Sequence, residues 1–210
     1  MRLRNIKNAS VIIENSNYVI KNPNDYKSNW NKVFENNNLI YIEIGMGKGK
    51  FIIENALKYK DVNFIGIEKY DSVLVKAIKR VEKLDIKNLK FIRCDASTLN
   101  NIFDKEISLI YLNFSDPWPK DRHYKRRLTS NDFLNIYDNI FKDKKHIVMK
   151  TDNRGLYEFS IMSLLNYGYK LKNISLDLHN SNIKDIITTE YEKKFIEKGN
   201  VIYMLECYKD

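Results

Sequence analysis

Short apolar segments alternate with amphipathic segments along most of this 210-residue chain. The apolar runs whose length predicts buried strands are residues 39–44, 63–67, 89–93, 107–114 and 146–150. The segments whose apolar residues recur at helical spacing are residues 50–59, 71–84, 131–141 and 154–165. Later, residues 169–176 and 201–207 predict two more strands, with a charged helix near residues 190–197 between them.

This alternation predicts one α/β domain with a parallel sheet that is covered by helices on both faces. Residues 1–38 are polar and rich in Asn, and they predict a lead-in segment with one short helix around residues 28–34. Residues 39–210 then form the domain. In such sheets ligands bind outside the carboxyl ends of the strands, and each motif described below falls at such an end.

The composition favours a folded protein, because 43% of the residues are hydrophobic and 30% are charged. No apolar run approaches the roughly 18–20 residues of a membrane span, and the N-terminus lacks the apolar part of a signal peptide. Cys94 and Cys207 lie in or beside strand-like segments, so we expect buried reduced thiols and a cytoplasmic protein. The net charge of +9 suits a nucleic-acid partner, although Lys and Asn are abundant throughout.

The most informative segment follows the fourth strand, where Asp116-Pro117-Trp118-Pro119 holds two of the three prolines of the chain. Each proline fixes its own φ and disfavours helix in the residue before it, which predicts a stiff, extended loop. A group of cations comes next: Lys120, Arg122, Lys125, Arg126 and Arg127. A rigid carboxylate beside such a cationic arm suits a site for a polyanion, whereas the alternative is a merely solvated face.

Glycines Gly45, Gly47 and Gly49 close the first strand and open a helix. They permit a tight turn and a close approach of a ligand to the backbone. The dinucleotide fingerprint requires a glycine at position 50, where this chain has Lys50. The loop alone is therefore weak evidence, since a structural turn has the same residues.

Three acids sharpen this interpretation, because Glu43, Glu68 and Asp95 lie at the ends of three successive strands. Glu68 stands where an acid accepts hydrogen bonds from ribose hydroxyls, and Asp95 where one reaches an adenine edge. An acidic rim without a phosphate-binding G-K-[ST] motif suits a nucleoside that carries positive charge and no phosphates. S-adenosylmethionine fits that description.

With these motifs in hand, the chain resembles the bacterial tRNA (guanine-N7)-methyltransferases over essentially its whole length. The runs that carry the resemblance are residues 43–49, 66–68, 113–120, 122–127, 150–155, 176–182, 189–192 and 194–195. Asp-Pro-Trp-Pro-Lys and Thr-Asp-Asn-Arg-Gly are specific, the glycine loop is not, and Met46 departs from the small or hydroxylated residue usual in the family. The resemblance implies a Rossmann-like class I methyltransferase domain with a mostly parallel seven-stranded sheet.

The resemblance also implies the methyl donor S-adenosylmethionine and, as substrate, a guanine in the tRNA variable loop. The cofactor contacts that it implies are Glu43, Gly45, Gly47, Gly49, Glu68, Asp95 and Asp116. The implied substrate contacts are Lys120, Asp152, Thr189, Glu190, Tyr191 and Glu192. The implied RNA contacts are Lys120, Arg122, His123, Lys125, Arg126 and Arg127. Both monomers and homodimers occur in the family.

Guanine N7 carries an in-plane lone pair and no proton, so methylation there needs alignment and electrostatics rather than prior deprotonation. Asp116 is the best candidate for a catalytic carboxylate that stabilises the charge developing on the base, although a role as base stays open. Asp152 or Glu192 could share the guanine edge. Trp118, Tyr124 and Tyr191 either stack on a base or pack against the protein.

The histidines show no metal-ligand spacing, so we expect no metal site. His123 lies among cations and suits a phosphate neighbour, His146 begins a strand and is expected to be structural, and His179 has no assigned role. The leading alternative function is a methyltransferase of the same fold that acts on another RNA base. A nucleic-acid-binding module without catalysis has no need for the three strand-end acids, and Lys50 disfavours a dehydrogenase.

Overall fold

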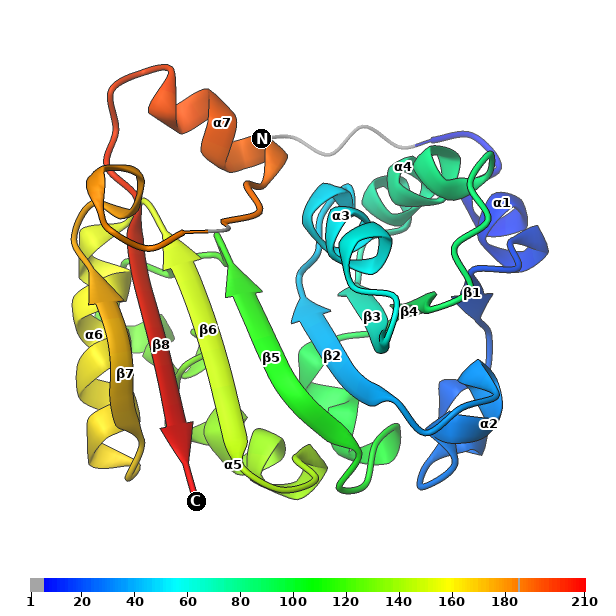
Figure 1. Ribbon diagram of the computed structural model, residues 1–210, viewed down its shortest axis with the longest axis horizontal. Helices are drawn as coiled ribbons and strands as arrows, with labels where there is room; N and C mark the ends of the chain where they lie inside the picture. The colour runs from blue at the N-terminus through cyan, green and yellow to red at the C-terminus, as the bar shows by residue number, and fades with distance from the viewer. Residues whose placement is uncertain (1–5, 185) are drawn as a thin grey trace.

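The computed structural model describes residues 6–184 and 186–210, and a single eight-stranded sheet forms their centre (Figure 1). In space the strands lie in the order β1-β4-β3-β2-β5-β6-β8-β7. Their bounds are β1 Val19–Ile20, β2 Leu39–Ile44, β3 Val62–Glu68, β4 Leu89–Arg93, β5 Ile107–Asn113, β6 Lys145–Thr151, β7 Lys170–Ser175 and β8 Tyr203–Lys209.

Strands β1 to β6 pair in parallel, whereas β8 runs antiparallel to both β6 and β7. The mostly parallel Rossmann-like sheet predicted from the sequence is therefore confirmed, with eight strands in place of seven. The additional strand is β1, which has two residues and pairs with β4 at the edge of the sheet. A strand of two residues is too short to show a periodic pattern, so it could not be predicted from the sequence.

Helices cover both faces, as predicted. The α-helices are α1 Ala9–Asn15, α2 Trp30–Phe34, α3 Lys50–Lys58, α4 Asp71–Val81, α5 Asn131–Ile140, α6 Arg154–Asn166 and α7 Glu190–Ile196. Short 3-10 helices occur at η1 Pro23–Tyr26, η2 Ala96–Asn101, η3 Asp121–Arg126 and η4 Leu178–Asn180. Successive residues of β3 show the two-sided core: Phe64 packs with α3 and α4, and Ile65 packs with the cluster on the other face.

The segment before β2 holds more structure than the one helix expected there. Besides α2 it contains α1, which packs against α4, and the strand β1. Trp30 of α2 is fully buried beside Phe103 and donates from Nε1 to the Ile102 carbonyl at 3.0 Å. Burial of this indole attaches α2 to the same core as the sheet.

The carboxyl ends of the parallel strands meet at one edge of the sheet, and α7 lies over that edge above β5 and β6 (Figure 1). Every segment that connects a parallel strand to its following helix emerges there, which places the sequence motifs together. Within residues 6–184 and 186–210, no helix combines the length and apolar character needed to cross a membrane.

Candidate active site

The glycine loop joins β2 to α3 in a backbone conformation that suits glycine. Gly45, Gly47 and Gly49 have φ of 74°, 59° and 74°, in the left-handed region that side chains with a Cβ rarely adopt. The amides of Gly45 and Met46 donate to the Ile67 carbonyl at 2.9 and 3.0 Å. The loop is therefore fixed against the end of β3, with its bare backbone beside a cavity.

Met46 packs into the core at this loop. Its side chain is buried and lies directly over Gly66 of β3, where an added Cβ would overlap the Met46 sulfur. The glycine in Gly66-Ile67-Glu68 thus makes room for the methionine.

Glu68 links the glycine loop to the next strand. It is almost completely buried, and its Oε2 accepts a hydrogen bond from the Gly47 amide at 3.2 Å while Oε1 accepts one from the Tyr70 amide at 2.9 Å. Burial raises the pKa of Glu68, and these backbone donors oppose the rise. Each carboxylate oxygen keeps a free lone pair for a ligand hydroxyl.

Asp95 follows β4 and is the N-cap of η2. Its Oδ1 accepts from the amide of Ser97 at 3.0 Å and from the Ser97 hydroxyl at 2.8 Å. The Ser97 amide, and more weakly the Lys69 ammonium 3.8 Å away, lower the pKa of Asp95. Asp95 therefore presents an oriented, ionised carboxylate.

The Asp116-Pro117-Trp118-Pro119 loop is held in an uncommon conformation. Phe114 and Trp118 have φ of 51° and 42°, a region that costs non-glycine residues on the order of 1–3 kcal/mol each. Arg127 donates to the Pro117 and Trp118 carbonyls at 3.0–3.3 Å and lies 4.4 Å from the Phe159 ring centroid. Arg127, which belongs to the predicted cationic arm, thus holds the loop in place through its backbone carbonyls.

Asp116 at the head of this loop is exposed. Among the described residues its carboxylate receives no hydrogen bond, although the Lys69 charge lies close enough to interact with it. The side chain of Trp118 lies beneath Arg126, whose guanidinium is 4.9 Å from the ring centroid, and meets His123 edge-on at 5.8 Å. Asp116 is accordingly free to bind a ligand.

These parts surround one cavity of about 610 Å³, called the first cavity below. Its polar wall is formed by Gly45, Gly47, Glu68, Asp95 and Asp116. The apolar wall consists of Ile44, Ile67, Val73, Leu128 and Phe133, and Lys125 and Arg126 of the cationic arm also line it. The structure therefore brings five of the seven predicted cofactor contacts to a single cavity.

A second cavity of about 430 Å³ lies on the other side of the glycine loop, beneath α7, and shares Gly45, Gly47, Val73 and Phe114 with the first. Glu43 lines it. Its Oε1 accepts a hydrogen bond from Nδ2 of Asn113 at 2.9 Å, whereas its buried Oε2 has no partner within residues 6–184 and 186–210. Burial raises the pKa of Glu43 to about 8 against the opposing effects of Asn113 and Lys150.

The wall of the second cavity opposite the sheet is α7, which is fixed by a buried ion pair. The fully buried Glu192 accepts from Lys150 Nζ at 2.7 Å and pairs with His179 at 2.8 Å. It also closes a capping box with Thr189. Both oxygens of the Glu192 carboxylate are thus engaged by protein groups, and Glu192 lines neither cavity.

Two other α7 residues reach the site. Glu190 accepts from Lys48 of the glycine loop at 3.1 Å and from Arg80 of α4 at 2.6 Å. The rings of Tyr191 and Phe195 stack with their centroids 4.2 Å apart. The Tyr191 hydroxyl lies 3.5 Å from Oδ2 of Asp152, the residue that follows β6. Thr189, Glu190 and Tyr191 line the second cavity.

Comparison with known proteins identifies the relatives of this chain. A family described as "Putative methyltransferase" matches residues 37–205. A tRNA (guanine-N(7)-)-methyltransferase of Lysinibacillus sphaericus is 51% identical, over 98% of this chain and 97% of that protein. The proteins of the same name from Lachnoclostridium phytofermentans and Streptococcus pyogenes are 47% and 50% identical, with at least 99% of both chains covered. The chain belongs to the bacterial tRNA (guanine-N(7)-)-methyltransferase family.

Solved structures confirm the methyltransferase fold of this family member. The structure of an antibiotic-related methyltransferase aligns with a TM-score of 0.64 at 18% identity, covering 87% of this chain and 92% of that one. The crystal structure of the 16S rRNA methyltransferase KamB aligns with a TM-score of 0.65 at 10% identity, over 86% and 92% of the two chains.

Other residues predicted for this methyltransferase lie apart from the two cavities. Lys120 and Arg122 are exposed in the cationic arm and line neither cavity. His146 pairs with Glu206 at 2.9 Å near the amino end of β6, away from the site, and burial lowers its pKa. Gly49 packs against Ala77 of α4, where an added Cβ would come within 3.0 Å, and it lines neither cavity.

Sequence reasoning missed Asn113, Lys150 and His179. Asn113 orients Glu43, and Lys150 with His179 anchors Glu192. A signal existed for Lys150, because a lysine inside an apolar strand needs a buried acidic partner. The identity of that partner was not readable, since Glu192 lies 42 positions further along the chain.

Proposed function

We propose that this protein transfers a methyl group from S-adenosylmethionine to N7 of a guanine in the variable loop of tRNA. The observation that carries the proposal is the first cavity, in which the glycine loop, Glu68, Asp95 and Asp116 meet beside cationic residues. The names and high identity of the relatives from three bacteria support guanine N7 of a tRNA as the site of methylation.

The residues of the site fit S-adenosylmethionine. Glu68 and Asp95 offer carboxylate lone pairs to hydroxyl and amine donors, beside an apolar wall suited to a base. The unpartnered Oε2 of Glu43 can form a hydrogen bond with a polar group of the ligand, and the exposed glycine backbone permits close approach. When bound, the cofactor supplies a methyl group activated by positively charged sulfur. We assign its binding to Glu43, Gly45, Gly47, Gly49, Glu68, Asp95 and Asp116.

Asp116 is the proposed catalytic residue. Guanine N7 has a lone pair available for attack, and the ring becomes positively charged as N7 is alkylated. A carboxylate placed beforehand beside the ring stabilises that charge and accepts hydrogen bonds from the N1–H and N2–H₂ edge. Asp116 suits this task because its position is fixed by the proline-rich loop and its oxygens are not used by the described protein groups.

Substrate binding is proposed for Lys120, Asp152 and residues 189–192. Asp152 and Tyr191 approach each other across the gap between β6 and α7, and Thr189 lines the adjoining cavity. Glu190 and Glu192 act in this scheme by holding α7, since their carboxylates pair with Lys48, Arg80, Lys150 and His179.

The cationic arm is the proposed RNA-binding surface. Lys120, Arg122, His123, Lys125 and Arg126 lie in or next to η3, and all but His123 are exposed. Their charges suit phosphates, which position an RNA, while the guanine pocket selects the base. Arg127 contributes indirectly, because it holds the loop that carries Asp116.

We place this reaction in the cytoplasm. Burial raises the pKa of Cys94 to about 11 and that of Cys207 to about 12, so both are protonated thiols at neutral pH. Both are free cysteines, consistent with a reducing compartment.

The test is to incubate the protein with labelled S-adenosylmethionine and unmodified bulk tRNA, and then to cleave the product with borohydride and aniline, which cut at N7-methylguanine. We expect label in the tRNA and cleavage in the variable loop. Label without cleavage would assign the enzyme to another RNA base. The Asp116→Asn protein is the matched control for contaminating activity.

A further inference from the structure

The second cavity is strongly basic. Its lining includes several lysines: Lys48 of the glycine loop, Lys50 of α3, Lys76 of α4, Lys194 of α7 and Lys198 in the turn that follows α7. Lys76, Lys194 and Lys198 are exposed to solvent, and these three residues are called the lysine wall below. No part of the cationic arm contributes to this cavity.

We propose that the lysine wall is a second phosphate-binding surface, which holds the RNA backbone on the side of the target guanine opposite to the cationic arm. This inference rests on the proposed function, because it takes RNA as the substrate. It adds a binding surface formed by α4, α7 and the turn that follows α7.

The acids that line the second cavity do not neutralise the lysine wall. Glu190 is shared between Lys48 and Arg80, at 3.1 and 2.6 Å. Glu43 lies at the buried floor, with a pKa raised to about 8 by burial, so it is mostly uncharged at pH 7. The wall therefore keeps its positive charge unless an anion from outside the chain compensates it.

The same region also holds like charges together. Lys193 lies next to Lys50, whose pKa is lowered first by burial and then by the Lys193 ammonium, although Glu54 at 3.6 Å partly compensates. Clustered lysines repel one another, which makes the folded arrangement less stable than dispersed charges. A polyanion that binds there relieves this repulsion.

The geometry of the two cavities favours a nucleic acid as the partner. Phe114, two residues before Asp116, lines both cavities, and Lys125 and Arg126 stand beside the first while the lysine wall stands beside the second. The proposed guanine site thus has cations on both sides. An RNA strand carries phosphates on both sides of every base, so it matches this arrangement, whereas a small anion needs only one side.

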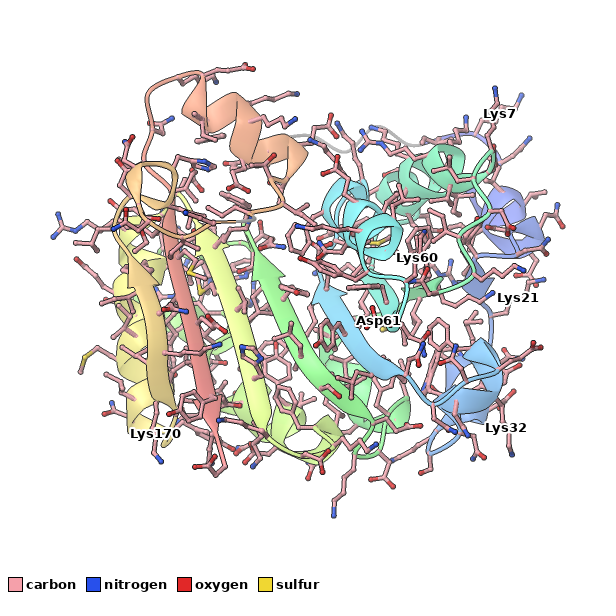
Figure 2. All side chains as sticks on the ribbon, viewed as in Figure 1. Lys7, Lys21, Lys32, Lys60, Asp61 and Lys170 are labelled. Atoms are coloured by element: carbon pink, nitrogen blue, oxygen red, sulfur yellow. The ribbon has the colours of Figure 1, made fainter. Side chains whose placement is uncertain are left out.

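The experiment compares the full-length Lys76→Ala/Lys194→Ala/Lys198→Ala variant with a control that removes three other exposed lysines. Lys32, Lys60 and Lys170 are suitable, because Figure 2 shows them away from α7. Binding of unmodified tRNA is measured as a function of salt concentration. For each lysine in phosphate contact, we expect the log–log slope to fall by about 0.7–0.9, with no change in the control.

A slope equal to that of the control would overturn the proposal. So would a variant that loses affinity for S-adenosylmethionine but keeps its affinity for tRNA, because the lysines would then serve the cofactor. Methylation by the wild-type protein is measured in parallel. Absent methylation with a changed slope contradicts the proposed reaction and leaves the RNA surface in place.

A second measurement needs no substitution and so does not depend on variant folding. The wild-type protein is acetylated at lysine with and without tRNA, and the modified positions are identified by mass spectrometry. We expect tRNA to protect Lys76, Lys194 and Lys198, but not Lys32, Lys60 or Lys170. Equal modification of the wall in both samples would contradict the proposal.

Discussion

The two cavities are built in different ways. The first is formed by strand ends and by backbone: glycines with positive φ, the N-cap Asp95, and a loop stiffened by prolines. The second is closed by α7, a helix of seven residues that is attached by side-chain ion pairs to partners far away in the sequence. The first cavity is therefore rigid by local chemistry, whereas the second depends on the pairing of buried charges.

The largest effect is expected where α7 is anchored. Lys150→Met leaves the Glu192 carboxylate buried without its cation, which costs about 3–5 kcal/mol of folding stability. Denaturant unfolding measures the loss. The double variant Lys150→Met/Glu192→Gln should recover much of it, and equal stability of the single and double variants would show that the pair does not anchor the helix.

The second prediction tests catalysis at the rigid cavity. Asp116→Asn keeps the shape of the loop and removes the charge, so we expect kcat to fall roughly 100-fold, or about 2.7 kcal/mol. Single-turnover rates at saturating cofactor and tRNA separate this from weaker cofactor binding. A rate within about threefold of wild type would reassign the role to Asp152.

Glu68→Ala should weaken cofactor binding while tRNA binding stays nearly intact. Loss of charge-assisted contacts to hydroxyls costs on the order of 1.5–3 kcal/mol, and the Gly47 amide loses its acceptor as well. Titration calorimetry with S-adenosylmethionine measures the change. Unchanged affinity in a folded variant would remove Glu68 from the cofactor site.

The raised pKa of Glu43 predicts how folding stability depends on pH. Its folded pKa of about 8 lies above that of an unfolded glutamate, so the folded state binds more protons between the two values. Stability from this group is present at acidic pH and falls as the pH rises toward 8, by at most about 1.4 kcal/mol per unit. Glu43→Gln should flatten the dependence of unfolding free energy on pH, and parallel curves for both proteins would contradict it.

The smallest effect separates two neighbours in the cationic arm. Arg126→Ala should lower the slope of log affinity for tRNA against log salt by about 0.7–0.9, since its side chain is exposed. Arg127→Ala should leave that slope unchanged and reduce turnover, because Arg127 supports the Asp116 loop. Equal slopes for the two variants would show that their roles are not distinct.

The sequence predicted those features that are local. The glycine loop, the strand-end acids and most helix bounds follow from patterns a few residues long, and the comparisons confirm the family and fold. The residue roles stay predictions, as does the division into a lead-in of residues 1–38 and a domain of residues 39–210. Burial of Glu192 was not predictable, because it depends on Lys150 and His179 meeting it in three dimensions.

The position of β8 has a consequence for biosynthesis. β8 inserts between β6 and β7, although it follows both in the chain, and α7 lies in the segment between β7 and β8. Until β8 has left the ribosome, the facing edges of β6 and β7 stay unpaired, and exposed strand edges favour aggregation. α7, which completes the second cavity, is therefore synthesised after most of the sheet. A nascent chain that lacks β8 already contains the glycine loop, but its sheet is incomplete.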